Sequence, residues 1–121
     1  GGYFKSIRFL HCVSSYPAPA EALSLYKLRR YCQLEGLSDH SDPELTWTGA
    51  LAVAAGARII EAHIRLDETD PENPDTPHAM TPAQFSDYVK HIRFAEACVG
   101  DEIIDGMHES EREMAQYRVV E

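Results

Sequence analysis

Three short β-rich segments alternate with helical segments along the chain, and this alternation constrains the fold more than any other feature of the sequence. We expect strands over 7–13, 36–39 and 57–64. Strands that alternate with helices favour a parallel α/β sheet, because each helix carries the chain back to the end of the sheet where the next strand begins. The sequence therefore predicts a three-stranded parallel sheet that is covered by helices.

Helix-start and helix-stop signals separate the predicted strands. Pro19 suits the first turn of a helix that reaches about Cys32. The Asp-Pro-Glu sequence at 42–44 opens a second helix, which we expect to run from 45 to about 55. The acidic, proline-rich segment 66–79 is expected to be an ordered loop.

A capping-box sequence at 81–84 predicts the start of a third and longer helix, with proline at its first position. An apolar stripe at helical spacing supports it, formed by Phe85, Tyr88, Val89, Ile92, Ala95 and Val99. Gly100 ends this helix, and a last short helix is expected over about 109–117.

The predicted sheet has too few strands to be complete. A chain of 121 residues is long enough for one domain with one hydrophobic core. A three-stranded parallel sheet nevertheless leaves two open edges, whereas parallel sheets are normally extended and covered. We therefore expect this domain either to be part of something larger or to assemble with copies of itself.

The charge balance and the cysteines limit the partners of the chain. Eleven Lys and Arg against 20 Asp and Glu give 11 − 20 = −9, which argues against nucleic acid because phosphate binding needs a basic surface. No apolar run approaches the roughly 20 residues that span a bilayer, so no membrane partner is expected. The widely spaced Cys12, Cys32 and Cys98 indicate small buried hydrophobic residues in a reducing cytoplasm rather than a disulfide scaffold.

Polar side chains follow each predicted strand, at the edge where parallel α/β folds bind ligands. His40 and His63 end two neighbouring strands and could converge on one metal ion. The alternative is that His40 caps a turn and that His63 is a satisfied, partly buried histidine. Ser14 and Ser38 either donate hydrogen bonds to an anion or form ordinary turns and caps. Tyr16 either walls a pocket or packs on the proline that follows it.

No single motif in the chain identifies a reaction. The sequence contains no nucleophile elbow, phosphate-binding loop, dinucleotide fingerprint or zinc-protease motif. His11 lies inside the first predicted strand and is interpreted as structural, and His78 lies in the long loop. The residues alone thus indicate an α/β piece with a candidate two-histidine site.

Taken together, the strand ends resemble the sialic acid synthase family in four segments. Segment 11–19, HCVSSYPAP, is similar to that family's HCxSxYPxP, and segment 36–41, GLSDHS, is similar to its GLSDHT/S. Segment 56–63, GARIIEAH, is similar to GAxxIEKHF, and segment 73–82, NPDTPHAMTP, is similar to a GPDH…SLxP loop. All four occur in order, and the resemblance covers nearly the whole chain.

The resemblance implies an α/β fold that is part of a (β/α)8 TIM barrel. The last three of the eight β/α units would occupy about 6–99, and 100–121 would form a tail helix. Members of the family condense phosphoenolpyruvate with an N-acetylated amino sugar, typically N-acetylmannosamine, to give a nine-carbon sialic acid and phosphate. They need a divalent metal, usually Mn²⁺ or Mg²⁺.

The resemblance also implies roles for six residues at the strand ends. The metal ligands are His40 and His63, the contacts to the phosphate of phosphoenolpyruvate are Ser14 and Ser38, and the residues facing the sugar acceptor are Tyr16 and Asp75. The chain departs from the family pattern at Asn73, where the family has Gly, and at Ala62, where it has Lys.

The predicted fragment lacks the first five strands of a barrel, and with them the family's lysine and the acidic residues that handle protons. We therefore assign no catalytic residue within the chain, and we expect it to lack a complete active site by itself. The partners implied are phosphoenolpyruvate, an amino sugar, and either further copies of the chain or a complementing barrel half. The alternative is a non-catalytic barrel fragment that homo-oligomerises through its open sheet edges.

Overall fold

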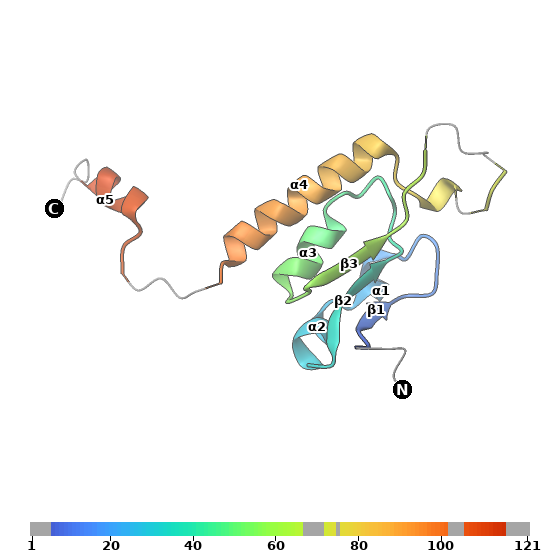
Figure 1. Cartoon of the computed structure of the whole chain (residues 1–121), viewed down its shortest axis with the longest axis horizontal. Helices are drawn as coiled ribbons and strands as arrows, with labels where there is room; N and C mark the ends of the chain where they lie inside the picture. Colours follow the sequence, from blue (N-terminus) through green and yellow to red (C-terminus); the bar gives the residue numbers. More distant parts are fainter. Residues whose placement is uncertain (1–5, 67–71, 75, 102–105, 116–121) are drawn as a thin grey trace.

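The computed structural model describes residues 6–66, 72–74, 76–101 and 106–115. Short strands alternate with helices along the chain (Figure 1). In order, the elements are β1 (Phe9–Cys12), α1 (Ala20–Leu23), α2 (Tyr26–Arg30), β2 (Leu34–Asp39), α3 (Thr48–Ala54), β3 (Ile59–Ala62), the 3-10 turn η1 (Thr76–His78), α4 (Pro82–Val99) and α5 (Glu109–Ala115).

The three strands form one sheet in the order β1-β2-β3, and both strand pairs are parallel, as the sequence predicts. The register places Ser38 of β2 opposite Cys12 of β1 and opposite Glu61 of β3. Gly36 allows β2 and β3 to approach closely, since a Cβ at this position would lie 1.7 Å from the backbone oxygen of Ile59. Within the described residues, β1 and β3 each pair on one side only.

The hydrophobic core lies between the helices and one face of β2. Leu37 has no solvent exposure, and it packs with Leu28 of α2 and Ala52 of α3. Side chains alternate between the two faces of a strand, so Ser38 and then His40 project from the opposite face. The buried face therefore fixes which side chains are available for a site.

The long helix α4 begins as the sequence predicts. The side chain of Thr81 accepts a hydrogen bond from the backbone N–H of Gln84 (3.2 Å), and the Gln84 side chain accepts one from the backbone N–H of Thr81 (2.9 Å). The helix packs against α3, and Figure 1 shows the two helices side by side. Part of its predicted apolar stripe remains open, because Val99 is 56% exposed.

The first predicted helix is wrong in detail. The segment after Pro19 forms two short helices, α1 and α2, and not one helix reaching Cys32. The break lies at Ser24, which adopts the left-handed conformation with φ 46° and ψ 51°. His11, buried on β1, donates from Nε2 to the carbonyl oxygen of Leu23 (2.6 Å), so that carbonyl is held by the sheet at the end of α1.

The second predicted helix begins later than expected. The sequence predicts that this helix runs from 45, opened by the Asp-Pro-Glu sequence at 42–44, whereas α3 begins at Thr48. The Asp42 carboxylate instead accepts the backbone N–H of Glu44 (2.9 Å), and the backbone oxygen of Asp42 accepts the N–H of Leu45 (2.9 Å). These contacts close a separate turn before the helix, as aspartate often does.

The cysteine prediction is half confirmed. All three cysteines are free, as expected, but Cys12, Cys32 and Cys98 are exposed and not buried in the core. Of the predicted last helix, α5 covers Glu109–Ala115, and residues 116 and 117 lie outside the described residues. In the described part of the chain, no helix has the length and apolar character needed to cross a membrane.

A buried polar network joins the end of β2 to α4. The Tyr88 hydroxyl donates to Oδ2 of Asp39 (2.6 Å), and the backbone N–H of Ser41 donates to Oδ1 of the same carboxylate (2.9 Å). Burial, together with the Asp39 carboxylate, raises the pKa of the Tyr88 phenol far above its usual value, so the hydroxyl remains a donor. Gly49 leaves the space for this ring, since a Cβ there would lie 2.6 Å from the Tyr88 hydroxyl oxygen.

Replacing Tyr88 by phenylalanine should lower the free energy of unfolding by about 1.5–3 kcal/mol, because a buried carboxylate oxygen loses its donor. Urea unfolding followed by circular dichroism measures the difference. Tyr26→Phe is the matched control, because Tyr26 is 69% exposed and should give no change. Equal stabilities for the two variants would show that the Tyr88–Asp39 contact does not hold α4 to the sheet.

Candidate metal and anion site

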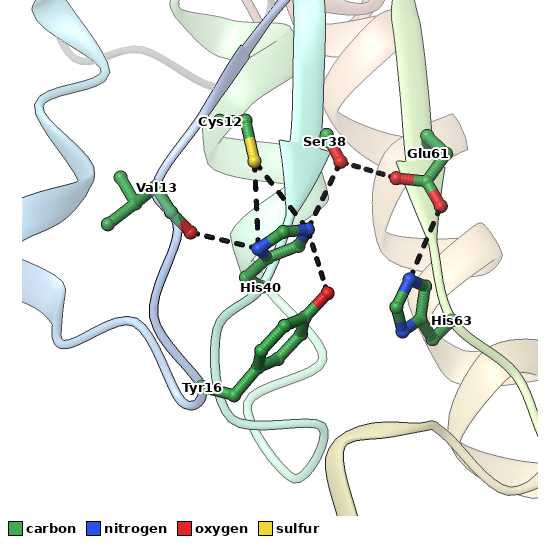
Figure 2. A network of polar contacts seen from close by, with 7 residues as sticks. All are labelled: Cys12, Val13, Tyr16, Ser38, His40, Glu61 and His63. Carbon is green, nitrogen blue, oxygen red and sulfur yellow. Dashed lines mark hydrogen bonds and ion pairs between the residues drawn. The ribbon is translucent and has the colours of Figure 1, made fainter. Parts of the chain in front are cut away.

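The candidate site lies at the carboxyl ends of the three parallel strands, on the face opposite the helices. Ser38 lies on β2, and His40 directly follows the strand. The two residues are two positions apart, so their side chains share a face. Glu61 and His63 have the same relation on β3. In Figure 2 the helices lie behind the strands, and these side chains project in front of them.

His40 is the central side chain of the site. Its Nδ1 lies 2.9 Å from the backbone oxygen of Val13, which can only accept, so Nδ1 carries the proton and donates. In the neutral ring, Nε2 then presents a lone pair towards the space shared with Ser38 and Tyr16. A backbone carbonyl on one ring nitrogen is the usual way to orient the other nitrogen of a metal-binding histidine.

Tyr16 covers His40 from the loop after β1. Its ring stacks on the imidazole with centroids 4.3 Å apart, and its hydroxyl donates to Nε2 of His40 (3.0 Å). The loop is held in turn by the backbone N–H of Ala18, which donates to the backbone oxygen of His40 (2.7 Å). Tyr16 therefore lies directly against His40, and its role as a wall of a ligand pocket stays a prediction.

Glu61 connects the two histidine positions. The Ser38 hydroxyl donates to Oε2 of Glu61 (2.5 Å), and Oε1 of Glu61 lies 3.8 Å from Nε2 of His63. One ligand atom from each of His40, Glu61 and His63 lies within 4.8 Å of the others. Two imidazoles and a carboxylate are a donor set that suits a divalent transition metal, so these residues fit such an ion.

Of the six residues that the family resemblance predicts for the site, four lie together: His40, His63, Ser38 and Tyr16. Ser14 is exposed, and no hydrogen bond among the described residues joins it to this cluster. Asp75 lies outside the described residues.

Two further residues, to which the sequence gives no predicted role, reach the site. Glu61 precedes His63 by two residues in the third predicted strand, and this spacing is the sequence signal that both share a face. His78 comes from η1 in the long loop, and its ring centroid lies 4.9 Å from that of Tyr16. No pattern in the sequence indicates this second contact, because it depends on how the loop folds back.

Cys12 adds a sulfur atom beside the imidazole of His40. Its Sγ lies 3.6 Å from both ring nitrogens, and the residue is exposed. Because Sγ is equidistant from the two nitrogens, it lies alongside the ring and not in line with the lone pair of Nε2. Cys12 therefore leaves Nε2 open to the Glu61 side of the site.

Three parallel β/α units with polar side chains at the carboxyl ends of the strands define the class of protein, a partial (β/α)8 barrel. Among solved structures, an N-acetylneuraminic acid (sialic acid) synthetase from Leptospira borgpetersenii, in complex with citrate, matches with a TM-score of 0.70 at 29% identity. The match covers 90% of this chain and 38% of that chain. The fold prediction is therefore confirmed.

The sequence comparisons identify the family. The NeuB family matches residues 3–104. A pseudaminic acid synthase of Campylobacter jejuni is 38% identical over 101 residues, which cover 80% of this chain and 29% of the relative. An N-acetylneuraminate-9-phosphate synthase of Homo sapiens is 32% identical over 101 residues, which cover 76% of this chain and 26% of the relative. The chain belongs to the NeuB family of sialic acid synthase-like proteins, and it spans less than a third of the length of these curated relatives.

The Tyr16 hydroxyl competes with any metal ion for the lone pair of His40 Nε2. Replacing Tyr16 by phenylalanine keeps the stacked ring and removes this competitor, which is worth about 1 kcal/mol, so Mn²⁺ should bind roughly threefold to tenfold more tightly. Isothermal titration calorimetry checks the change. Tyr31→Phe, on an exposed tyrosine away from the site, should leave the affinity unchanged. Weaker binding in Tyr16→Phe would mean that the hydroxyl supports the ion.

Proposed function

We propose that this chain supplies part of the active site of a metal-dependent synthase that condenses phosphoenolpyruvate with an N-acetylated amino sugar, N-acetylmannosamine or a close relative. One observation carries the proposal: ligand atoms of His40, Glu61 and His63 lie within 4.8 Å of one another at the ends of adjacent parallel strands. The metal would be Mn²⁺ or Mg²⁺, and the NeuB membership supports this class of reaction.

In this proposal, different residues of the chain bind the metal ion, the phosphate of phosphoenolpyruvate and the sugar. His40, Glu61 and His63 hold the ion, which when bound supplies Lewis-acid polarisation of the acceptor's aldehyde oxygen. The hydroxyl of Ser38 turns from Glu61 to the phosphate of phosphoenolpyruvate, with Ser14 as a second donor. Tyr16 and Asp75 face the sugar, where Tyr16 provides a flat apolar wall and Asp75 accepts hydrogen bonds from sugar hydroxyls.

The proposed reaction joins two carbon atoms and releases phosphate. The enol carbon of phosphoenolpyruvate attacks the aldehyde carbon, water adds at the neighbouring carbon, and inorganic phosphate leaves. The chain's residues bind and orient both substrates, but none of them is assigned the proton transfers. We therefore propose that the chain alone is inactive, and that activity needs the remaining barrel units, because a preorganised site requires all of its walls.

The metal site is tested by titrating Mn²⁺ into the chain in the presence of phosphoenolpyruvate, followed by calorimetry. One site per chain is expected. His40→Ala and His63→Ala should each abolish it, and Glu61→Gln should weaken it by about tenfold or more, the usual range for loss of a ligand or its support. His108→Ala, on an exposed histidine far along the chain, is the control and should bind like the wild type.

Two results would contradict this proposal. Absence of Mn²⁺ binding to the wild type would mean that the strand ends do not form a metal site. Binding that survives in both histidine variants would place the ion elsewhere. A separately produced first-half barrel provides the complementary test, since phosphate release from phosphoenolpyruvate and N-acetylmannosamine should require both parts.

A second candidate function, a non-catalytic module that assembles with its own copies, is favoured by the open sheet edges. A groove of about 710 Å³ runs between β3 and α4, and its apolar lining includes Ile60, Phe85 and Val99. β3 pairs on one side only within the described residues, so a further strand would cover this groove.

We also propose a reducing cytoplasm as the location, which the free cysteines support.

The oligomeric state tests this second candidate. Light scattering at low micromolar concentration should give a mass above 13.6 kDa, because the apolar edges need cover. Replacing Phe85, which is 37% exposed, by lysine should shift the protein towards monomer without unfolding it. A monomer at all concentrations for the wild type would exclude self-assembly and leave the synthase proposal standing.

A further inference from the structure

His78 is a half-buried histidine that has no role in the function proposed above. Its ring centroid lies 4.9 Å from that of Tyr16, with an angle of 34° between the ring planes. Tyr16 also stacks on His40, whose ring centroid is 4.3 Å away. Two imidazoles from different parts of the chain, one directly after β2 and one on η1, therefore pack near the same tyrosine ring.

The short turn η1 that carries His78 is anchored to the end of β3. The backbone N–H of Met80 donates to the backbone oxygen of His63 (2.9 Å), and Met80 also forms a parallel β-bridge with Ile64. Met80 itself is buried, with 4% of its surface exposed. Because the backbone two residues beyond His78 is bonded to His63, His78 is held close to the candidate metal ligands.

Tyr16 lies on the exposed loop after β1, and its own side chain is 39% exposed. Its hydroxyl donates to Nε2 of His40 (3.0 Å), a contact that Figure 2 shows from close by. A single hydrogen bond to an exposed side chain contributes little, because water offers the same bond and because fixing the side chain costs rotamer entropy. A second ring packed near Tyr16 adds stabilisation, since paired aromatic rings attract each other beyond the area that they bury.

The position of Tyr16 matters because the lone pair of His40 Nε2 serves one partner at a time. The Tyr16 hydroxyl donates to this lone pair in the structure. An ion that binds there has to displace the hydroxyl, so any contact that holds Tyr16 in place lowers the apparent affinity for the ion. A displaced ring that still packs on His78 would stay at the site, with its hydroxyl available to a substrate.

We propose that His78 is a positioning residue that holds the Tyr16 hydroxyl on Nε2 of His40 and thereby sets the affinity of the site for a divalent metal ion. The inference rests on the proposed function, in which His40 is a metal ligand. Among the described residues, the group of candidate ligands within 4.8 Å of one another consists of His40, Glu61 and His63. His78 therefore acts through Tyr16 and not on the ion.

The test measures Mn²⁺ affinity by calorimetry for the full chain, for His78→Ala, for Tyr16→Phe and for the double variant. His78→Ala should bind Mn²⁺ about twofold to tenfold more tightly, the fold-change that corresponds to one pair of packed rings. In the Tyr16→Phe background, which lacks the competing hydroxyl, the same substitution should change the affinity by less than about twofold. His78→Phe keeps a ring against Tyr16 and should bind Mn²⁺ like the wild type.

A second measurement follows the contact itself in the metal-free protein. The nuclear Overhauser effect between the ring protons of Tyr16 and His40 should be present in the wild type and in His78→Phe, and it should weaken in His78→Ala. His91→Ala is the matched control, because it removes another stacked pair, Trp47–His91, whose centroids are 3.6 Å apart. This control should change neither the Mn²⁺ affinity nor the Overhauser signal.

The outcomes separate this inference from the proposed function. Wild-type affinity in His78→Ala, or an equal gain in affinity in both backgrounds, would overturn it, because His78 would then not act through Tyr16. Weaker Mn²⁺ binding in His78→Ala would also overturn it, since His78 would then support the ion. If the wild type binds no Mn²⁺, the proposed function fails together with the affinity effect, and the Overhauser measurement still decides whether His78 holds Tyr16 on His40.

Discussion

The carboxylate of Asp39 is the constraint on which the site depends. It ends β2 on the buried face, where Tyr88 and the backbone N–H of Ser41 hold it. A buried carboxylate that accepts a hydrogen bond on each oxygen cannot move to the other face of the sheet without leaving its donors unpaired. The orientation of the strand end is therefore fixed. The residues on either side of it, Ser38 and His40, must then project from the opposite face. The connection from α4 to the sheet thus determines which side chains reach the candidate metal site.

Much of the fold could be predicted because it follows from local patterns. Alternating strands and helices, the capping box at Thr81 and the spacing of polar residues after each strand are all properties of short segments. The break at Ser24 could not be predicted this way, because it coincides with a tertiary contact, the hydrogen bond from His11 of β1 to the carbonyl oxygen of Leu23. The exposed cysteines were missed for a related reason: a small hydrophobic residue is buried only if something covers it, and the covering elements belong to tertiary structure.

In the candidate site too, local sequence patterns predict some features and tertiary structure decides the others. His40 and His63 could be predicted as a pair, because parallel strands bring their carboxyl ends to one edge. The pairing of Glu61 with Ser38 required the register, which the sequence alone does not give. The approach of His78 to Tyr16 depends on where η1 lies relative to the strand ends. The side chains at the strand ends could therefore be predicted as a site from the sequence, whereas the contact that the loop makes with Tyr16 could not.

The parallel pairing of β2 with β3 holds Ser38 opposite Glu61, and each chain segment continues one residue past the paired residues to reach His40 and His63. Substitutions in the loop that follows β3 leave this pairing unchanged. A protein built in this way can alter what its loop contacts without altering the register that sets the spacing of its metal-binding side chains.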